Sequence, residues 1–370
     1  MASRALRGLV TGGVALAAAG WALRDIPDEF GGKASGDRLA RMEGSPRFRD
    51  GSFHNSVPAS VLAASSAPQI MREMARNRAA RRPTGDVPLV SAPSTPASAD
   101  GVSAIWYGHA STLVELEGRR ILFDPVWSER VSPSQLVGPR RLHPLPVPLA
   151  ELPAPDAVVI SHDHYDHLDR ATVKALLAAH SAPFLVPLGI GAHLERWGVP
   201  AERIVELDWE EEAVVAGLRF TATAARHFSG RTLRRNDTLW GSWVVAGARH
   251  RVFYAGDSGY FDGYAKIGAE HGPFDLTLMP IGAYSPNWPD IHMDPEEAVA
   301  AHLDLGGRLL LPVHWATFDL APHPWAEPVD RLLREAKATG TTLALPRPGD
   351  RVTTTLPEQA PWWETLVAAG

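Results

Sequence analysis

The chain has 370 residues, of which 45% are hydrophobic and 21% are charged, and its net charge at pH 7 is -6. This length is sufficient for one large domain or two smaller ones. The chain has no cysteine, which excludes disulfides and thiolate metal sites, so any metal ion must be bound by carboxylates and the 15 histidines. The acidic balance and the lack of a long basic run disfavour nucleic acid as a partner.

The first residues have the pattern of an export signal. Arg4 and Arg7 precede an uncharged run, residues 8–23, which ends before Arg24. A basic start followed by an apolar stretch and small residues is typical of a secretory signal or a signal anchor, and an amphipathic or buried helix is the alternative. We therefore expect residues 1–24 to make the protein membrane-associated, and the charge order favours the extracytoplasmic side for the rest.

Residues 25–100 lack sustained periodicity and are interpreted as an extended linker or wrap. Pro, Ser and Ala dominate residues 83–99, which is typical of a linker. A short helix is predicted between Pro68 and Arg81, because Pro is tolerated in a first helical turn. The main domain is expected to span residues 101–350, and residues 351–370 are expected to form a tail.

Within the main domain, short apolar runs separated by turn residues predict many strands. The predicted strands cover residues 104–107, 111–116, 120–124, 156–160, 184–186, 204–206, 213–215, 218–222, 240–246, 251–255, 276–280 and 309–311. Helices are predicted from the N-cap Asp169 to about His180 and over residues 295–304 and 328–338. Strands mixed with helices in this order favour two sheets covered by helices, a layered α/β architecture.

The densest group of potential metal ligands follows the predicted strand at residues 156–160. The segment HDHYDH, residues 162–167, contains three His and two Asp. Side chains alternate along an extended backbone, so His162 and His164 point to the same side. Asp166 and His167 follow where the chain turns into a helix. The segment can therefore offer two imidazoles to one metal ion and a carboxylate with an imidazole to a second, and both groups are good zinc ligands.

One segment cannot complete two coordination spheres, so further ligands must come from later in the chain. His227, Asp257 and His314 are the candidates, because each follows an apolar strand as His162 does. Rigid elements position a site well, which favours ligands at strand ends. The carboxylate of Asp257 could bridge two cations held about 3.5–4 Å apart.

The ordered set of HDHYDH, His227, Asp257 and His314 resembles the metallo-β-lactamase superfamily. The fold that this resemblance implies is an αββα four-layer sandwich. The sequence is most similar to the branch of N-acyl-phosphatidylethanolamine-hydrolysing phospholipase D and its bacterial relatives. The similarity rests on stretches such as WYGHASTLVELEG, ILFDPVWSERVSP, SHDHYDHLD, RHFSGR, GDSGY and HWATFDL, which lie between about residues 101 and 346.

The resemblance implies two zinc ions per chain and seven ligands. The first zinc would be bound by three histidines, the second by one aspartate and two histidines, and one aspartate would bridge them. The ligands of the first zinc would be His162, His164 and His227, those of the second would be Asp166, His167 and His314, and the bridging residue would be Asp257. The carboxylates of Asp166 and Asp257 are the expected catalytic groups, because they would hold the attacking hydroxide and take part in proton transfer.

Four further residues match positions around such a site. Tyr165 either contacts the substrate or packs beside the metal loop, and His292 either contacts the substrate head group or only precedes a helix. Asp124 resembles a buried aspartate that orients a metal-bound histidine from behind. His109, in the GHAS turn, either lies beside it or is a turn residue bonded to the backbone.

The leading functional hypothesis is a dinuclear zinc phosphodiesterase of the phospholipase D type. It would use a metal-bridging hydroxide to release phosphatidic acid from N-acyl-phosphatidylethanolamine-like lipids at a membrane surface. Two alternatives remain open: a lactonase or another carboxylic ester or amide hydrolase of the same fold, and a non-catalytic, membrane-anchored metal-binding protein. No GxSxG motif is present, which argues against a serine α/β-hydrolase. A homodimer is compatible with these hypotheses.

Overall fold

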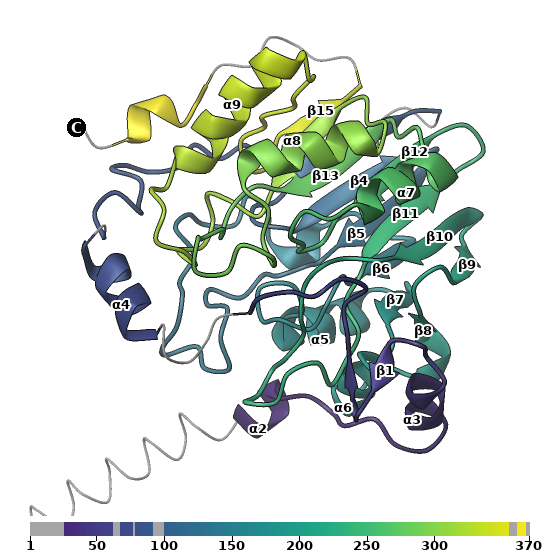
Figure 1. Ribbon diagram of the computed structural model, residues 1–370. Helices are drawn as coiled ribbons and strands as arrows, with labels where there is room; N and C mark the ends of the chain where they lie inside the picture. The colour runs from purple at the N-terminus through teal and green to yellow at the C-terminus, as the bar shows by residue number, and fades with distance from the viewer. Residues whose placement is uncertain (1–25, 62–66, 77, 92–99, 355–360, 368–370) are drawn as a thin grey trace, which may run out of the picture.

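The computed structural model describes residues 26–61, 67–76, 78–91, 100–354 and 361–367, and two β-sheets packed face to face form its centre (Figure 1). The expected export segment, residues 1–24, lies outside these ranges. Among the residues that the structure describes, no helix combines the length and apolar character needed to span a bilayer.

The first sheet has seven strands, antiparallel from β15 to β5 and parallel from β5 to β8. Its strand order is β15 (Arg351–Thr353), β3 (Val102–Trp106), β4 (Thr112–Leu116), β5 (Arg119–Phe123), β6 (Ala157–Val159), β7 (Phe184–Pro187) and β8 (Ile204–Leu207). In the parallel part, Phe123 of β5 pairs with Val159 of β6. Both strands therefore end at the same edge of the sheet.

The second sheet has six strands, of which β12, β13 and β14 are parallel and the others antiparallel. Its order is β14 (Leu310–Val313), β13 (Leu276–Pro280), β12 (Arg251–Tyr254), β11 (Ser242–Ala246), β10 (Leu218–Thr223) and β9 (Glu212–Val215). Ala216 and Gly217, which join β9 and β10, both have positive φ angles, as a tight hairpin requires.

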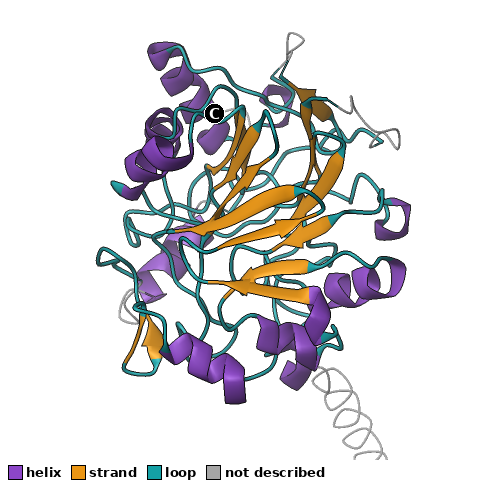
Figure 2. Ribbon diagram, turned by 90° about the vertical axis from the view of Figure 1, so that its right-hand side faces the viewer, coloured by secondary structure: helices purple, strands orange, loops and turns teal. Residues whose placement is uncertain are grey.

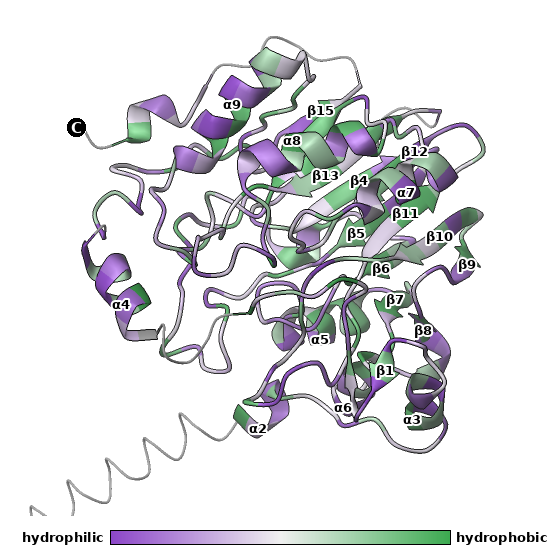
Figure 3. Cartoon of the chain, viewed as in Figure 1, coloured by the Kyte–Doolittle hydropathy of each residue, from purple (hydrophilic) through white to green (hydrophobic). Residues whose placement is uncertain are grey.

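The core between the sheets follows from the two-residue period of the strands. In β4 and β6, Val114 and Val159 face the second sheet, whereas their neighbours Leu113 and Val158 face the opposite side. All four are buried, because helices cover the outer face. Figure 3 shows this as hydrophobic colour along the strands, with hydrophilic positions on the helices.

Helices cover the outer faces of both sheets (Figure 2). On the seven-stranded sheet, Val173 and Leu194 pack into the outer cluster from α5 (Arg170–Ala179) and α6 (Gly191–Arg196). On the six-stranded sheet the covering helices are α7 (Gly263–His271), α8 (Pro295–Asp304) and α9 (Glu327–Thr339). Asp169 caps α5 by accepting the Ala171 N–H at 3.2 Å, as predicted. The layered, mixed α/β prediction is confirmed.

The segment expected to be an extended wrap contains regular elements, which corrects that prediction. They are α2 (Ile26–Glu29), α3 (Gly36–Glu43), β1 (Phe48–Arg49), β2 (Ser52–Phe53) and α4 (Ala67–Arg76). The last of these confirms the helix predicted between Pro68 and Arg81. We call residues 26–61 the N-terminal strap. Met42 and Phe53 anchor it, because both are buried in a cluster with Leu188 and Trp240 of the main domain.

The expected tail also differs from the structure. Residues 351–353 form β15, which pairs with β3, so the boundary drawn at residue 350 falls inside the sheet. Trp363 is fully buried, and its Nε1 donates to Asp330 of α9 at 2.9 Å. Three short 3-10 helices complete the described elements: η2 (Leu149–Glu151), η3 (Ala201–Arg203) and η4 (Glu364–Leu366).

Candidate metal centre

The seven predicted ligands lie at one edge of the molecule, beyond the carboxyl ends of strands from both sheets. The segment 162–167 follows β6 in the first sheet. In the second sheet, His227 follows β10, Asp257 follows β12 and His314 directly follows β14. Since the two sheets pack face to face, this edge brings together side chains that are far apart in the sequence.

Three histidines form the first group. His162 Nε2 lies 2.8 Å from His164 Nδ1, and His227 Nε2 lies 3.3 Å from the same atom. His162 and His227 are buried and His164 is partly buried. Three imidazole nitrogens therefore converge on a volume that a single cation could occupy.

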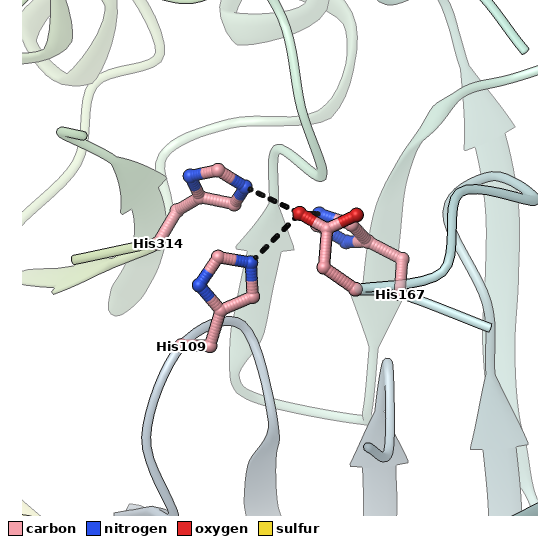
Figure 4. Close-up of side chains that lie close together, drawn as sticks. His109, His167 and His314 are labelled. Atoms are coloured by element: carbon pink, nitrogen blue, oxygen red, sulfur yellow. Dashed lines mark hydrogen bonds and ion pairs between the residues drawn. The ribbon is translucent and has the colours of Figure 1, made fainter. Parts of the chain in front are cut away.

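The second group consists of Asp166, His167, His314 and His109. Asp166 Oδ2 is 3.4 Å from His314 Nε2, 3.7 Å from His167 Nε2 and 3.0 Å from His109 Nε2. Figure 4 shows His314 and His109 directed at this carboxylate from one side, with His167 on the other. The GHAS histidine thus contacts the site through its side chain.

Asp257 lies between the two groups. Its Oδ2 atom is 3.1 Å from Nε2 of both His167 and His314, and 3.9 Å from Nε2 of both His162 and His227. A single carboxylate oxygen is therefore within reach of both groups. This is the arrangement that a bridging carboxylate needs.

The histidines are held from behind through their other ring nitrogens. His227 Nδ1 hydrogen bonds with the Ile291 carbonyl at 2.8 Å, and His162 Nδ1 with Ser161 Oγ at 2.9 Å. In each case the Nε2 atom is left facing the centre. Such partners fix the ring orientation and tautomer of a metal-binding histidine.

His167 is held in the same way by Asp124, at the end of β5. His167 Nδ1 is 2.6 Å from Asp124 Oδ2, which also accepts from Ser161 Oγ at 2.5 Å and from the Tyr254 hydroxyl. The other oxygen, Oδ1, accepts the Ser161 N–H at 2.7 Å. Asp124 thus has the contact with a site histidine that the resemblance implied, and Tyr254 is a neighbour that the sequence did not reveal.

Three residues of the site adopt positive φ angles, which residues with side chains rarely do. The φ values are 51° for His109, 37° for Asp124 and 62° for His314. Such conformations cost on the order of 1–3 kcal/mol each and persist where the surroundings impose them. Each of these residues lies in the turn that follows a strand; the side chains of His109 and His314 contact Asp166, and that of Asp124 holds His167 from behind.

Electrostatics keep the first group neutral. Burial, together with the neighbouring imidazoles, lowers the pKa of His162 well below its ordinary value. Burial likewise lowers the pKa of His164 and holds the pKa of His227 well below the ordinary value. Neutral imidazole is the form that binds a metal ion, so this group is prepared for a cation at neutral pH.

The aspartates of the centre remain ionised in spite of their burial. Burial alone would raise their pKa values, but His167 and the other nearby histidines hold the pKa of Asp166 and of Asp257 well below the ordinary value. Conversely, burial would lower the pKa of His314, but Asp257 and Asp166 raise it to about 9. The centre therefore pairs carboxylates with imidazoles in a buried space.

The residues present fit a bound cation. Among the residues that the structure describes, the buried atoms His167 Nε2, His314 Nε2 and Asp257 Oδ1 make no hydrogen bond of acceptable geometry, although both Nε2 atoms lie 3.1 Å from Asp257 Oδ2. Nearly all buried polar atoms in proteins are hydrogen-bonded, so orphaned atoms at a shared centre need a ligand. Imidazole and carboxylate donors suit zinc, iron or manganese.

The two predicted substrate contacts differ in their surroundings. The Tyr165 hydroxyl donates to the Arg231 carbonyl at 2.8 Å, and the Arg231 guanidinium lies 4.1 Å from the centre of its ring. His292 is 3.8 Å from Asp257 Oδ2 and lines a cavity of about 560 Å³ together with Tyr284 and Arg331. His292 thus connects the centre to a space that could accept a substrate, whereas Tyr165 has structural partners.

Asp163, which lies between the predicted ligands His162 and His164, has other partners than the centre. It is buried, accepts the Gly230 N–H at 2.7 Å and lies 3.4 Å from His193 Nε2. Its position between two ligands places it on the opposite side of the backbone, where α6 and the segment after His227 cover it.

Comparison with known proteins shows that most of the main domain matches a single protein family. The family described as "Beta-lactamase superfamily domain" matches residues 119–315. An uncharacterized protein of Mycobacterium tuberculosis is 54% identical over 372 residues, which covers 98% of this chain and 100% of that protein. N-acyl-phosphatidylethanolamine-hydrolyzing phospholipase D 1 of Caenorhabditis elegans is 39% identical over 248 residues, which covers 64% of this chain and 70% of that protein.

Solved structures show the same architecture. A metallo hydrolase from the archaeon Ignicoccus hospitalis aligns with a TM-score of 0.55 at 22% identity, over 70% of this chain and 100% of that chain. At this identity the likeness concerns the fold.

Proposed function

The chain belongs to the metallo-β-lactamase superfamily of metal-dependent hydrolases, and on this premise we propose that it is a dinuclear zinc phosphodiesterase that acts on phospholipids of the N-acyl-phosphatidylethanolamine type.

The position of Asp257 supports two metal ions better than one. Its Oδ2 atom lies 3.1 Å from two histidines of the second group and 3.9 Å from two histidines of the first. We assign His162, His164 and His227 to one ion, Asp166, His167 and His314 to the other, and Asp257 to both. This is the assignment implied by the sequence resemblance.

Bound zinc ions would supply a hydrolytic nucleophile at neutral pH and a counter-charge for the substrate oxygens. The chain's own residues would handle the proton and the substrate. Asp166 and Asp257 stay ionised, so either carboxylate can accept a proton as the nucleophile forms. His292 faces both Asp257 and the cavity, which suits a residue that contacts the substrate head group.

The lipid substrate is proposed from the relatives and from the cavity. The Caenorhabditis elegans relative carries the name of an N-acyl-phosphatidylethanolamine-hydrolyzing phospholipase D. The cavity beside His292, about 560 Å³, is within the range of small-molecule sites and could accept a head group. Association with a membrane surface through residues 1–24 would bring the centre to such a substrate.

The test combines metal analysis with hydrolysis assays on the purified protein. We expect about two zinc ions per chain and release of phosphatidic acid from N-acyl-phosphatidylethanolamine vesicles. His164→Ala removes a ligand of the first ion and should lower turnover by about 100-fold or more. His180→Ala is the control, since His180 caps α5 and does not contact the centre.

Other outcomes would redirect the proposal. Turnover of lactones or carboxylic esters but not of the phospholipid would replace the phosphodiesterase by the alternative hydrolase. Bound zinc without activity on any of these substrates would favour a non-catalytic metal-binding protein. Fewer than one metal ion per chain would overturn the metal centre itself.

A further inference from the structure

We propose that Asn55, in the N-terminal strap, is a positioning residue for His227, so that the strap forms part of the metal centre. The strap lies outside residues 119–315, the part of the chain that the family match covers. The inference rests on the metal centre proposed above, but it concerns how one ligand is held and is independent of the substrate.

Asn55 hydrogen bonds to both backbone groups of His227. Its Nδ2 donates to the His227 carbonyl at 2.7 Å, and its Oδ1 accepts the His227 N–H at 3.1 Å. The side-chain amide of Asn55 thus hydrogen bonds to both the N–H and the carbonyl of His227, as a residue of a neighbouring antiparallel strand would. With the ring fixed at Ile291, both the backbone and the imidazole of His227 are held.

His227 needs this support because it lies beyond the end of its strand. β10 ends at Thr223, and His227 belongs to no strand ladder. Its side chain is fully buried, so backbone groups without partners nearby would be costly. In the described part of the chain, Asn55 provides the hydrogen bonds found for both of these groups.

Asn55 is itself fixed by its neighbours. Trp240 Nε1 donates to Asn55 Oδ1 at 3.1 Å and to the Ala225 carbonyl at 3.0 Å. Two residues earlier, Phe53 is fully buried, and its N–H donates to the Asn236 carbonyl at 2.9 Å. The strap therefore presents the Asn55 amide in one defined orientation.

The beginning of the strap supports the metal loop at a second point. The Glu29 carbonyl accepts from Arg231 Nε at 2.7 Å. Arg231 Nη1 in turn donates to the carbonyls of Asp163 and Leu168, each at 2.8 Å. These carbonyls lie on either side of the ligands Asp166 and His167. Strap contacts thus reach both the metal loop and the His227 segment.

The experiment measures zinc affinity in the absence of substrate, by competition with a chromophoric chelator, on the full chain. Asn55→Ala removes both hydrogen bonds and should weaken zinc binding by about 10–100-fold, as expected when a partner that orients a ligand is lost. Asn55→Asp keeps the acceptor but loses the donor, and should lie between Asn55→Ala and the wild type. The absorption spectrum of the cobalt-substituted protein should change in both variants.

His54→Ala is the matched control, because His54 is adjacent in the strap and its ring bonds only to Ser52 and Arg49 within the described residues. It should leave zinc affinity and the cobalt spectrum unchanged. Wild-type affinity in Asn55→Ala, or equal losses in Asn55→Ala and His54→Ala, would overturn the inference.

If Asn55→Ala does not fold, Asn55→Asp decides in its place: weakened zinc binding supports the inference and wild-type binding overturns it. These outcomes are separate from the proposed function, because a wild-type protein that binds zinc but hydrolyses no phosphodiester leaves this test intact.

Discussion

Asp124 shows how much of the candidate centre depends on a residue that is not itself an assigned ligand. It has no exposed surface, and one of its oxygens, Oδ2, accepts from Ser161 Oγ, Tyr254 and His167. The other accepts a backbone N–H from Ser161. Both carboxylate oxygens of Asp124 therefore accept hydrogen bonds from neighbouring residues. The orientation of His167 is inseparable from this carboxylate.

Asp124→Asn should weaken zinc binding by about 10–100-fold. Asparagine has only one acceptor oxygen, so its NH₂ group must replace one of the two carboxylate oxygens. In one orientation the NH₂ group would face the Ser161 N–H, and in the other it would face the three groups that donate to Oδ2. The unsatisfied donors should also lower the free energy of unfolding by about 1–3 kcal/mol. Chelator competition and urea unfolding measure the two effects.

The control for this substitution is Asp262→Asn, an exposed position without a side-chain cap bond. It should change neither quantity. Wild-type zinc affinity in Asp124→Asn would show that His167 is held in place by something other than Asp124.

At the same scale, the sequence allowed the seven candidate ligands to be predicted because four of them lie in the dense HDHYDH segment after an apolar strand and the other three each follow an apolar strand. It did not reveal Tyr254 or Asn55. Tyr254 is one more aromatic residue of a buried strand, and its role depends on the packing of one sheet on the other. Asn55 acts across 172 positions of sequence, and no local pattern marks it.

Among the elements, a clamp joins the two sheets at the end opposite the candidate centre. Glu117, in the turn between β4 and β5, accepts the backbone N–H groups of Ala248, Arg249 and His250 in the turn between β11 and β12. The distances are 2.8–2.9 Å, and His250 Nδ1 lies 3.2 Å away. One carboxylate therefore holds the starts of β5 and β12, whose carboxyl ends lead to Asp124 and Asp257.

This clamp predicts a pH-dependent contribution to stability. Partial burial would raise the pKa of Glu117, but the three backbone N–H groups and His250 outweigh it and lower the pKa to about 2. A carboxyl with a lowered folded-state pKa stabilises the protein above its unfolded value of 4.5, and this contribution is lost as the pH falls towards 2. Glu117→Gln should thus cost about 2 kcal/mol at pH 7 and progressively less in acid.

Urea unfolding of the wild type and Glu117→Gln at pH 7, 4 and 3 measures this difference. The exposed Glu202 provides the control substitution Glu202→Gln, which should have no comparable effect at any of these pH values. If the difference in the free energy of unfolding is the same at every pH, the stabilisation by Glu117 depends on its shape and not on its charge.

The elements that sequence patterns missed are those made by tertiary contacts. In α7, Gly263 and Gly268 lower helix propensity, yet Gly268 permits a close approach, since a Cβ there would lie 2.2 Å from the Asp304 carbonyl oxygen. The three residues of β15 include the strand formers Val352 and Thr353 but are too few for a strand to be predicted, and they are held by pairing with β3. Strands with continuous apolar runs, such as β6, were predicted because burial on both faces is visible in the sequence.

For the whole molecule, the main consequence of the architecture is that the assigned ligands belong to two different sheets. The segment 162–167 follows β6 of the seven-stranded sheet, whereas His227, Asp257 and His314 follow strands of the six-stranded sheet. Bound ions would therefore connect the two halves of the sandwich. Their binding energy would add to the stability of the folded state, because the unfolded chain has no preformed site.

Removal of the metal should destabilise the whole protein and not only the loops of the centre. With free zinc at about 1,000 times the dissociation constant, the stabilisation is about 4 kcal/mol. A chelator should lower the thermal midpoint in one cooperative transition, and added zinc should restore it. His164→Ala should respond less to zinc. Equal midpoints with and without chelator would contradict the role of metal in joining the sheets.

The order of the assigned ligands along the chain has a consequence for biosynthesis. The strap, with Asn55, leaves the ribosome before HDHYDH, and His314 emerges after all the other assigned ligands. Domains generally fold as units once their sequence is available. A growing chain would therefore expose three histidines of one loop well before the second sheet can complete the centre. Both metal ions would then be bound only after the second sheet has been synthesised and folded. A truncated chain that lacks the last strands could not retain both ions.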